Sequence, residues 1–174
     1  VGALPFYFYT SQFHKATAWE EQVKALLEKG GESLDLPTRI SIYASYMAIY
    51  NTTCEFEKTA EWFETYLREP SAGDGIMFQT ELHIMGIVAH SELGNDAVVT
   101  SLCRSLQRVL QKKTGDFEME RVFIRFIQKE PPPTERKAHW QEFANALSAF
   151  PKTQGARSAY AMFDLMTWMK GKVQ

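Results

Sequence analysis

At 174 residues, with 45% of them hydrophobic and 23% charged, the chain is long enough for one domain with its own apolar core and too apolar to be disordered. Its 19 basic and 21 acidic residues nearly cancel, which excludes a global field that would attract nucleic acid or an anionic membrane. No apolar run approaches the roughly 20 residues of a membrane-spanning helix, so we expect no contact with a membrane.

The first predicted element is a helix over 4–15, and it begins with apolar side chains that something should cover. The chain starts at Val1 rather than at Met, so we expect it to be the C-terminal part of a longer protein. Phe6, Tyr7, Phe8 and Tyr9 should then pack against an upstream part of the same chain or against a second copy of it.

Prolines and helix-cap signals divide the rest of the chain into helical segments, because proline cannot continue a helix interior. Thr17 and Glu20 have the spacing of a capping box, and Asn95, Asp116 and Thr134 mark further helix starts. The predicted helices after the first cover 18–30, 37–51, 55–68, 75–92, 96–113, 117–129, 134–149 and 155–171. No segment alternates polar and apolar residues over a useful length, so the predicted fold class is all-α.

Two of these helices differ in how their apolar residues are distributed. In 96–113 the apolar residues fall on one face, which predicts a surface helix with a single buried stripe. In 37–51 they occur on several faces, as expected of a helix that packs between neighbours. Helices of this length joined by short loops form antiparallel hairpins. We predict a single domain, 1–174, with hairpins over 4–30, 37–68, 75–113 and 117–149 and a closing helix over 155–171.

The hairpins show weak self-similarity in sequence. Alignment places Trp19, Phe56 and Asp96 at equivalent positions, with spacings of 37 and 40 residues. The same register pairs Tyr50 with His90, Phe63 with Cys103 and Tyr66 with Leu106. Such spacing is typical of solenoids built from repeated hairpins.

The segment AIYNTTCEFEKTAEWFETYL resembles a hairpin of the tetratricopeptide-like (TPR-like) repeats, with aromatic residues near the end of the first helix and at the start of the second. HIMGIVAHSELGNDAVVTSLCRSLQRVL resembles a degenerate next copy, and the C-terminal helices are similar to those that close large bacterial repeat proteins of unassigned function. The resemblance implies a short right-handed α-α superhelix. Because the usual repeat is about 34 residues, its curvature cannot be carried over to this chain.

The resemblance also implies which residues face the concave surface of the superhelix. They are Tyr7, Ser11 and His14, then Ser41, Ala44, Ala48 and Asn51, then Glu81, Ile84, Val88, Ser91 and Glu92. From this set we select as partner-binding candidates Asn51, Glu81, Ser91, Glu92, Tyr7 and His14. Asn51 ranks first, because an amide can both donate to and accept from a peptide backbone. The alternative is that Asn51 only ends helix 37–51 as a turn residue.

Two patterns that contain histidine could indicate a metal site. His83 and His90 are seven residues apart on one helix, or roughly 10 Å, too far to hold one ion together, so we interpret them as packing residues. Glu135, His139 and Glu142 have helical spacing that could converge on a cation. A single helix seldom completes such a site, and we interpret the three as part of a solvated face.

No sequence motif supports catalysis or nucleotide binding, so we predict a protein that is not an enzyme and has no cofactor. The two cysteines, Cys54 and Cys103, are too few and too far apart for a disulfide framework or a zinc knuckle, which favours a reducing compartment, the cytoplasm.

A basic stripe runs through Arg104, Arg108 and Lys112, with Lys113, Arg121 and Arg125 nearby in sequence. No aromatic residues alternate with it, so we interpret it as a solvated helix face and not as a nucleic-acid site.

Two function classes remain. The leading one is a non-catalytic protein-interaction scaffold that presents a concave helical surface to a protein or peptide. The alternative is a ligand-responsive regulatory or nucleic-acid-associated helical domain, which only the basic stripe supports.

Overall fold

The computed structural model describes residues 13–30, 34–69, 76–112, 117–129, 131–132, 134–150 and 165–173, and every regular element in these ranges is a helix. The helices are α2 (Phe13–Thr17), α3 (Glu20–Gly30), α4 (Leu36–Thr52), α5 (Phe56–Leu67), α6 (Ile76–Glu92), α7 (Asp96–Gln111), α8 (Glu118–Ile127), α9 (Arg136–Ser148) and α11 (Leu165–Val173). The all-α prediction is therefore confirmed for the described part of the chain. Most of the first predicted helix, with Tyr7 and the neighbouring aromatic residues, lies outside the described ranges, as do 155–164.

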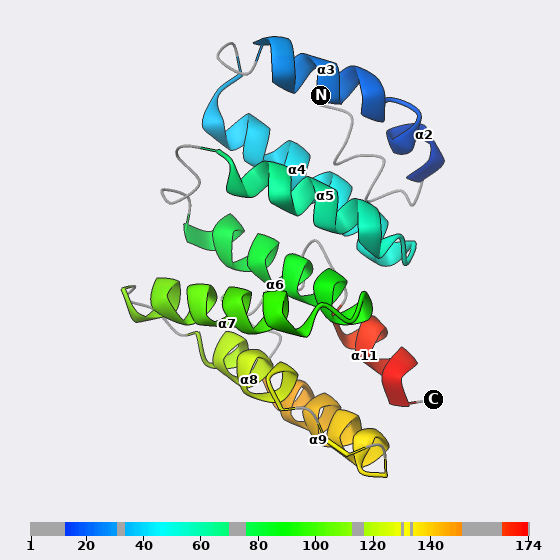
Figure 1. Cartoon of the computed structure of the whole chain (residues 1–174), viewed down its shortest axis with the longest axis vertical. Coiled ribbons are helices and arrows are strands. Elements are labelled where there is room, and N and C mark those ends of the chain that lie inside the picture. Colours follow the sequence, from blue (N-terminus) through cyan, green and yellow to red (C-terminus); the bar gives the residue numbers. More distant parts are fainter. Residues whose placement is uncertain are drawn as a thin grey trace.

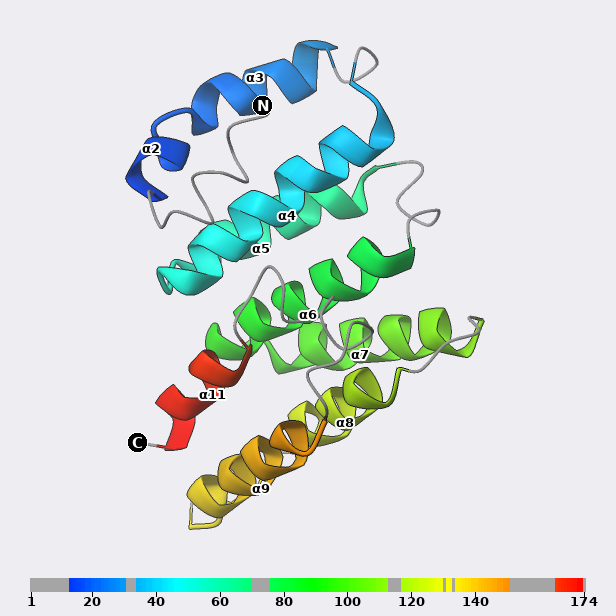
Figure 2. The same ribbon diagram turned by 180° about the vertical axis from the view of Figure 1, so that it is seen from behind.

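The helices are stacked in two layers from α3 to α9, as Figures 1 and 2 show from opposite sides. Helix α4 packs against α5 and α6, and α6 packs in turn against α5 and α7. Because α4 has neighbours on several sides, every residue from Ile42 to Asn51 is buried. In α7 only one stripe is buried, made of Val99, Leu102, Cys103, Leu106 and Leu110. Both patterns were predicted from the sequence.

The α4–α5 and α6–α7 turns have the same backbone structure, 40 residues apart. In the first, the Glu55 N–H donates to the Tyr50 carbonyl at 2.8 Å; in the second, the Asn95 N–H donates to the His90 carbonyl at 2.9 Å. Each turn contains one left-handed residue, Cys54 with φ 60° and Gly94 with φ 69°. The match supports the predicted register that pairs Tyr50 with His90.

The predicted helix caps are less accurate than the predicted helices. The Thr17 hydroxyl donates back to the His14 carbonyl at 3.3 Å, and the side chain of Asn95 makes no cap hydrogen bond to α7. Thr134 precedes α9 by two residues, and Asp116 lies outside the described ranges. One cap was missed: the Asp35 carboxylate accepts from the Thr38 N–H at 2.8 Å and starts α4.

A buried carboxylate ties α3 to the next hairpin. Glu20, which is 9% exposed, accepts from the Tyr50 hydroxyl of α4, from Trp62 Nε1 of α5 at 2.8 Å and from Lys24 Nζ at 3.1 Å. Burial opposes ionisation of this carboxyl, but the three donors outweigh it and lower the pKa of Glu20. The Trp62 ring also stacks on Tyr46 with a centroid separation of 4.5 Å, so the same residues carry apolar and polar contacts.

The fourth hairpin, α8–α9, packs against the third over a short stretch of α7 and α8, and its Glu120 lies near Glu81 of α6. Helix α11 instead packs along α9, where Leu165 and Met169 are fully buried and the Trp168 ring meets the edge of Trp140 at 5.6 Å. This placement brings α11 next to the end of α6 (Figure 2). The C-terminal helix α11 thus lies near the C-terminal ends of α4 and α6, which are the first helices of two successive hairpins.

A candidate binding pocket at the ends of α4 and α6

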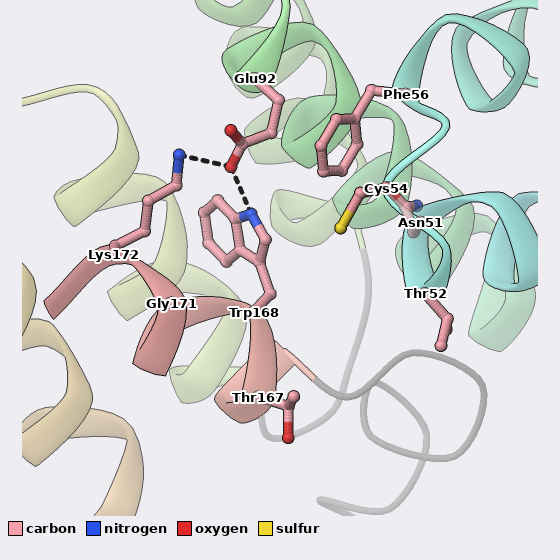
Figure 3. Close-up of a pocket in the computed structure, with 9 residues that line it drawn as sticks. All are labelled: Asn51, Thr52, Cys54, Phe56, Glu92, Thr167, Trp168, Gly171 and Lys172. Carbon is pink, nitrogen blue, oxygen red and sulfur yellow. Dashed lines mark hydrogen bonds and ion pairs between the residues drawn. The ribbon is translucent and has the colours of Figure 1, made fainter. Parts of the chain in front are cut away.

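A pocket of about 330 Å³ lies between the α4–α5 turn, the end of α6 and α11 (Figure 3). Its wall is formed by Asn51, Thr52, Cys54, Phe56, Glu92, Thr167, Trp168, Gly171 and Lys172. The α4–α5 turn and the last residue of α6 supply its first half, because α4 and α6 pack against each other. The C-terminal helix supplies its second half.

Glu92 holds the two halves of the pocket together. Its Oε1 accepts a hydrogen bond from Trp168 Nε1 at 2.5 Å and pairs with Lys172 Nζ at 2.5 Å. The Lys172 ammonium also lies over the Trp168 ring, 5.7 Å from its centroid. The side chain of Glu92 is 17% exposed and that of Lys172 is 31% exposed, so water screens this pair only in part.

Asn51 lies in the same wall but is buried, with 3% of its surface exposed. Its Nδ2 donates to the Met85 carbonyl of α6 at 3.3 Å, while its Oδ1 has no hydrogen-bond partner among the described residues. The partner-binding role of Asn51 therefore stays a prediction. Asn51 stands in the last turn of α4 and bonds the next hairpin, and its Oδ1 is buried from solvent.

Cys54 contributes an exposed thiol to the pocket. Its backbone is left-handed, a conformation that costs a non-glycine residue roughly 1–2 kcal/mol and that the equivalent turn assigns to Gly94. The second cysteine, Cys103, is fully buried in α7. The chain therefore has a single accessible thiol, and this thiol lies in the pocket wall.

The other partner-binding candidates do not join Asn51 and Glu92. Ser91 is half-buried beside Glu92, and His14 is exposed on α2, away from the pocket wall. Tyr7 lies outside the described residues. Ser41 is half-buried, and the prediction of an open groove is wrong for the remaining inner positions, because neighbouring helices cover Ala44, Ala48, Ile84 and Val88.

Glu81 is the clearest of these corrections. It was predicted to face a partner, but only 7% of its surface is exposed. Burial, together with the nearby carboxyl of Glu120 on α8, raises the pKa of Glu81 to about 8. The fold therefore keeps this carboxyl protonated at neutral pH.

The histidines occupy packing positions. His83 Nδ1 lies 2.7 Å from the Gln79 carbonyl and its ring meets the edge of Phe63, while His90 Nδ1 lies 3.2 Å from Asn95 Nδ2. Burial lowers the pKa of both His83 and His90. The prediction of a solvated face is wrong for His139, which is 5% exposed because it packs on α8, although Glu135 and Glu142 are exposed.

Within the described ranges, no three His, Cys, Asp or Glu side chains gather closely enough to hold a metal ion. None of the helices seen there has the length and apolar character needed to cross a bilayer. Arg104 and Arg108 are exposed on α7 and Lys112 is exposed directly after it, as predicted for the basic stripe. A further cavity of about 390 Å³ lies between α3, α4 and α5, and one carboxylate in its wall, Glu69, accepts from Tyr43 and Arg39.

Sequence reasoning missed the second half of the pocket. Trp168 and Lys172 lie 76 and 80 residues from Glu92 in the chain, and no repeat register predicts their approach. Their spacing of one helical turn was the available signal, because it places an indole donor and a cation on one face of a helix. The chain matches no protein-family model, no curated protein and no solved structure with which it was compared.

Proposed function

We propose that this protein is a non-catalytic interaction module, a short right-handed TPR-like superhelix whose protein or peptide partner docks where the first helices of two successive hairpins end. The observation that carries the proposal is the pocket itself. Equivalent ends of α4 and α6 meet there, and the wall contains Asn51 and Glu92, two residues chosen from the repeat register.

The pocket has the properties of an anchoring site for a partner. Its volume of about 330 Å³ is at the lower end of the range for small-ligand sites and suits one large side chain. Aromatic groups from Phe56 and Trp168 stand beside a few polar groups, a mixture that gives both burial and orientation. Stacked hairpins extend such a site along neighbouring helices, so one anchor can be joined by weaker contacts.

The state of the cysteines supports a cytoplasmic location for this module. Cys54 and Cys103 are both free thiols, and Cys54 is exposed. Exposed thiols persist in reducing compartments and are oxidised outside them. We therefore place the interaction in the cytoplasm.

The proposal is tested by affinity capture from cells that express the protein naturally. Glu92→Lys reverses the charge in the pocket wall, whereas Glu57→Lys makes the same change at an exposed position of α5 that is not in the wall. A partner that the wild type and Glu57→Lys retain and that Glu92→Lys loses supports the proposal. Circular dichroism checks that all three chains are folded. Equal retention by the two variants would overturn the assignment of the partner to this pocket.

A further inference from the structure

We propose that the pocket binds the tryptophan side chain of a peptide partner, whose indole N–H donates to the Glu92 carboxylate in the pocket wall. This inference rests on the proposed function and adds the chemistry of the partner's anchoring residue.

The first observation is that the Glu92 carboxylate can accept a further hydrogen bond. The contacts of the Glu92 carboxylate with Trp168 and Lys172 are both made through Oε1 (Figure 3). A carboxylate has about four lone-pair sites, so a ligand that brings a donor can bond Glu92 in addition to Trp168 and Lys172. Asn51 Oδ1 is buried from solvent and is not open to such a ligand.

The second observation is the charge of the wall. Lys172 neutralises Glu92 at 2.5 Å, so the pocket as a whole is uncharged. A second cation, such as a partner's arginine, would meet the Lys172 ammonium. An uncharged donor avoids that repulsion and still bonds the carboxylate.

The third observation is shape. Phe56 and Trp168 place aromatic groups in the wall, and they favour a flat ring between or beside them. An indole has one N–H donor and no acceptor, whereas a phenol oxygen would also direct lone pairs at the Glu92 carboxylate. Trp168 already makes the same indole-to-carboxylate hydrogen bond to Glu92 within the chain. Tryptophan is also among the side chains that most often anchor protein interfaces.

The pocket is accessible from solvent, because Thr52, Cys54, Thr167 and Gly171 are exposed in its wall. The thiol of Cys54 therefore reports occupancy without any engineered label. Cys103 is fully buried and contributes no background reaction while the chain is folded. A molecule in the pocket should slow the alkylation of Cys54.

The experiment measures the rate of Cys54 alkylation by a small maleimide in the presence of N-acetyltryptophanamide. We expect this probe to protect Cys54, and its 1-methyl analogue, which has the same ring but no N–H, to protect at about tenfold higher concentration. Glu92→Gln should reduce the preference for the unmethylated probe, and the exposed Glu57→Gln should leave it unchanged. Because the methylation comparison uses the wild type, it does not depend on whether a variant folds.

Equal protection by the two probes would overturn the proposed hydrogen bond, and absence of protection by either would overturn the indole site. Both results leave the capture experiment free to succeed, since a partner can use another anchor at the same surface. The opposite combination is also informative. If N-acetyltryptophanamide protects Cys54 but Glu92→Lys and Glu57→Lys capture the partner equally, the indole site is supported. The captured partner then does not bind through this site.

Discussion

Glu81 allows the most quantitative test of the structure, because its burial makes the stability of the fold depend on pH. The residue is 7% exposed on α6, and burial with the nearby Glu120 raises its pKa from 4.5 to about 8. In the unfolded chain the same carboxyl titrates at its ordinary value. Between these two pKa values the folded chain binds a proton that the unfolded chain does not bind.

The sign and size of the effect follow from this difference. For a carboxyl whose folded pKa is raised, the free energy of unfolding falls as pH increases from about 4.5 to about 8, by about 1.4 kcal/mol per pH unit. From pH 4.5 to pH 7 the loss amounts to about 3 kcal/mol. Glu81→Gln keeps the shape of the protonated side chain without the titration. The variant should therefore be up to about 3 kcal/mol more stable than the wild type at pH 7, and the difference should close near pH 4.

Urea unfolding monitored by circular dichroism at several values between pH 4 and pH 8.5 measures this difference. Glu57→Gln serves as the matched control, because Glu57 is exposed on α5 and its replacement should change stability by less than about 0.5 kcal/mol. If the free energy of unfolding of Glu81→Gln and that of the wild type changed in parallel across this range, the claim that Glu81 is protonated in the folded chain would be refuted.

Three further changes test the packing that positions the pocket. Glu20→Gln should destabilise the fold by about 1.5–3 kcal/mol in urea unfolding at pH 7, because it weakens hydrogen bonds from Tyr50 and Trp62 to a carboxylate; this difference should shrink as pH falls through the lowered pKa of Glu20. Gly86→Ala should lower the melting temperature, with a cost of about 1–3 kcal/mol, because the added Cβ would lie 2.6 Å from the Phe63 ring; Phe63→Leu in the same chain should recover part of that loss. Cys54→Gly should fold normally and abolish thiol alkylation of the native chain, since Gly94 fills the equivalent left-handed position, whereas Cys54→Val should cost about 1–2 kcal/mol.

The sequence predicted the helices well because their apolar residues recur with the helical period and their ends carry turn residues. The 40-residue register was visible for the same reason, and the two turns around Cys54 and Gly94 have matching hydrogen bonds. Cap prediction was weaker, because local patterns such as that of Thr17 compete with other hydrogen bonds in the same turn.

The candidate site was predictable only in its first half. Asn51 and Glu92 follow from the register, because they stand at the ends of equivalent helices. The approach of Trp168 depends on how α11 packs against α9, and this long-range contact has no periodic signal in the sequence. The burial of Glu81 depends similarly on where α8 lies, so a residue expected at a surface became part of the interior.

The central claim is that a partner docks at the ends of α4 and α6, and site-specific photo-crosslinking in the native cells tests it most directly. A benzoylphenylalanine placed at Thr52, an exposed residue in the pocket wall, is compared with one at Gln107, which is exposed on α7 outside it. We predict a covalent adduct with one defined protein or peptide from Thr52 and none from Gln107. Adducts in equal yield from both positions, or from Gln107 alone, would contradict the claim.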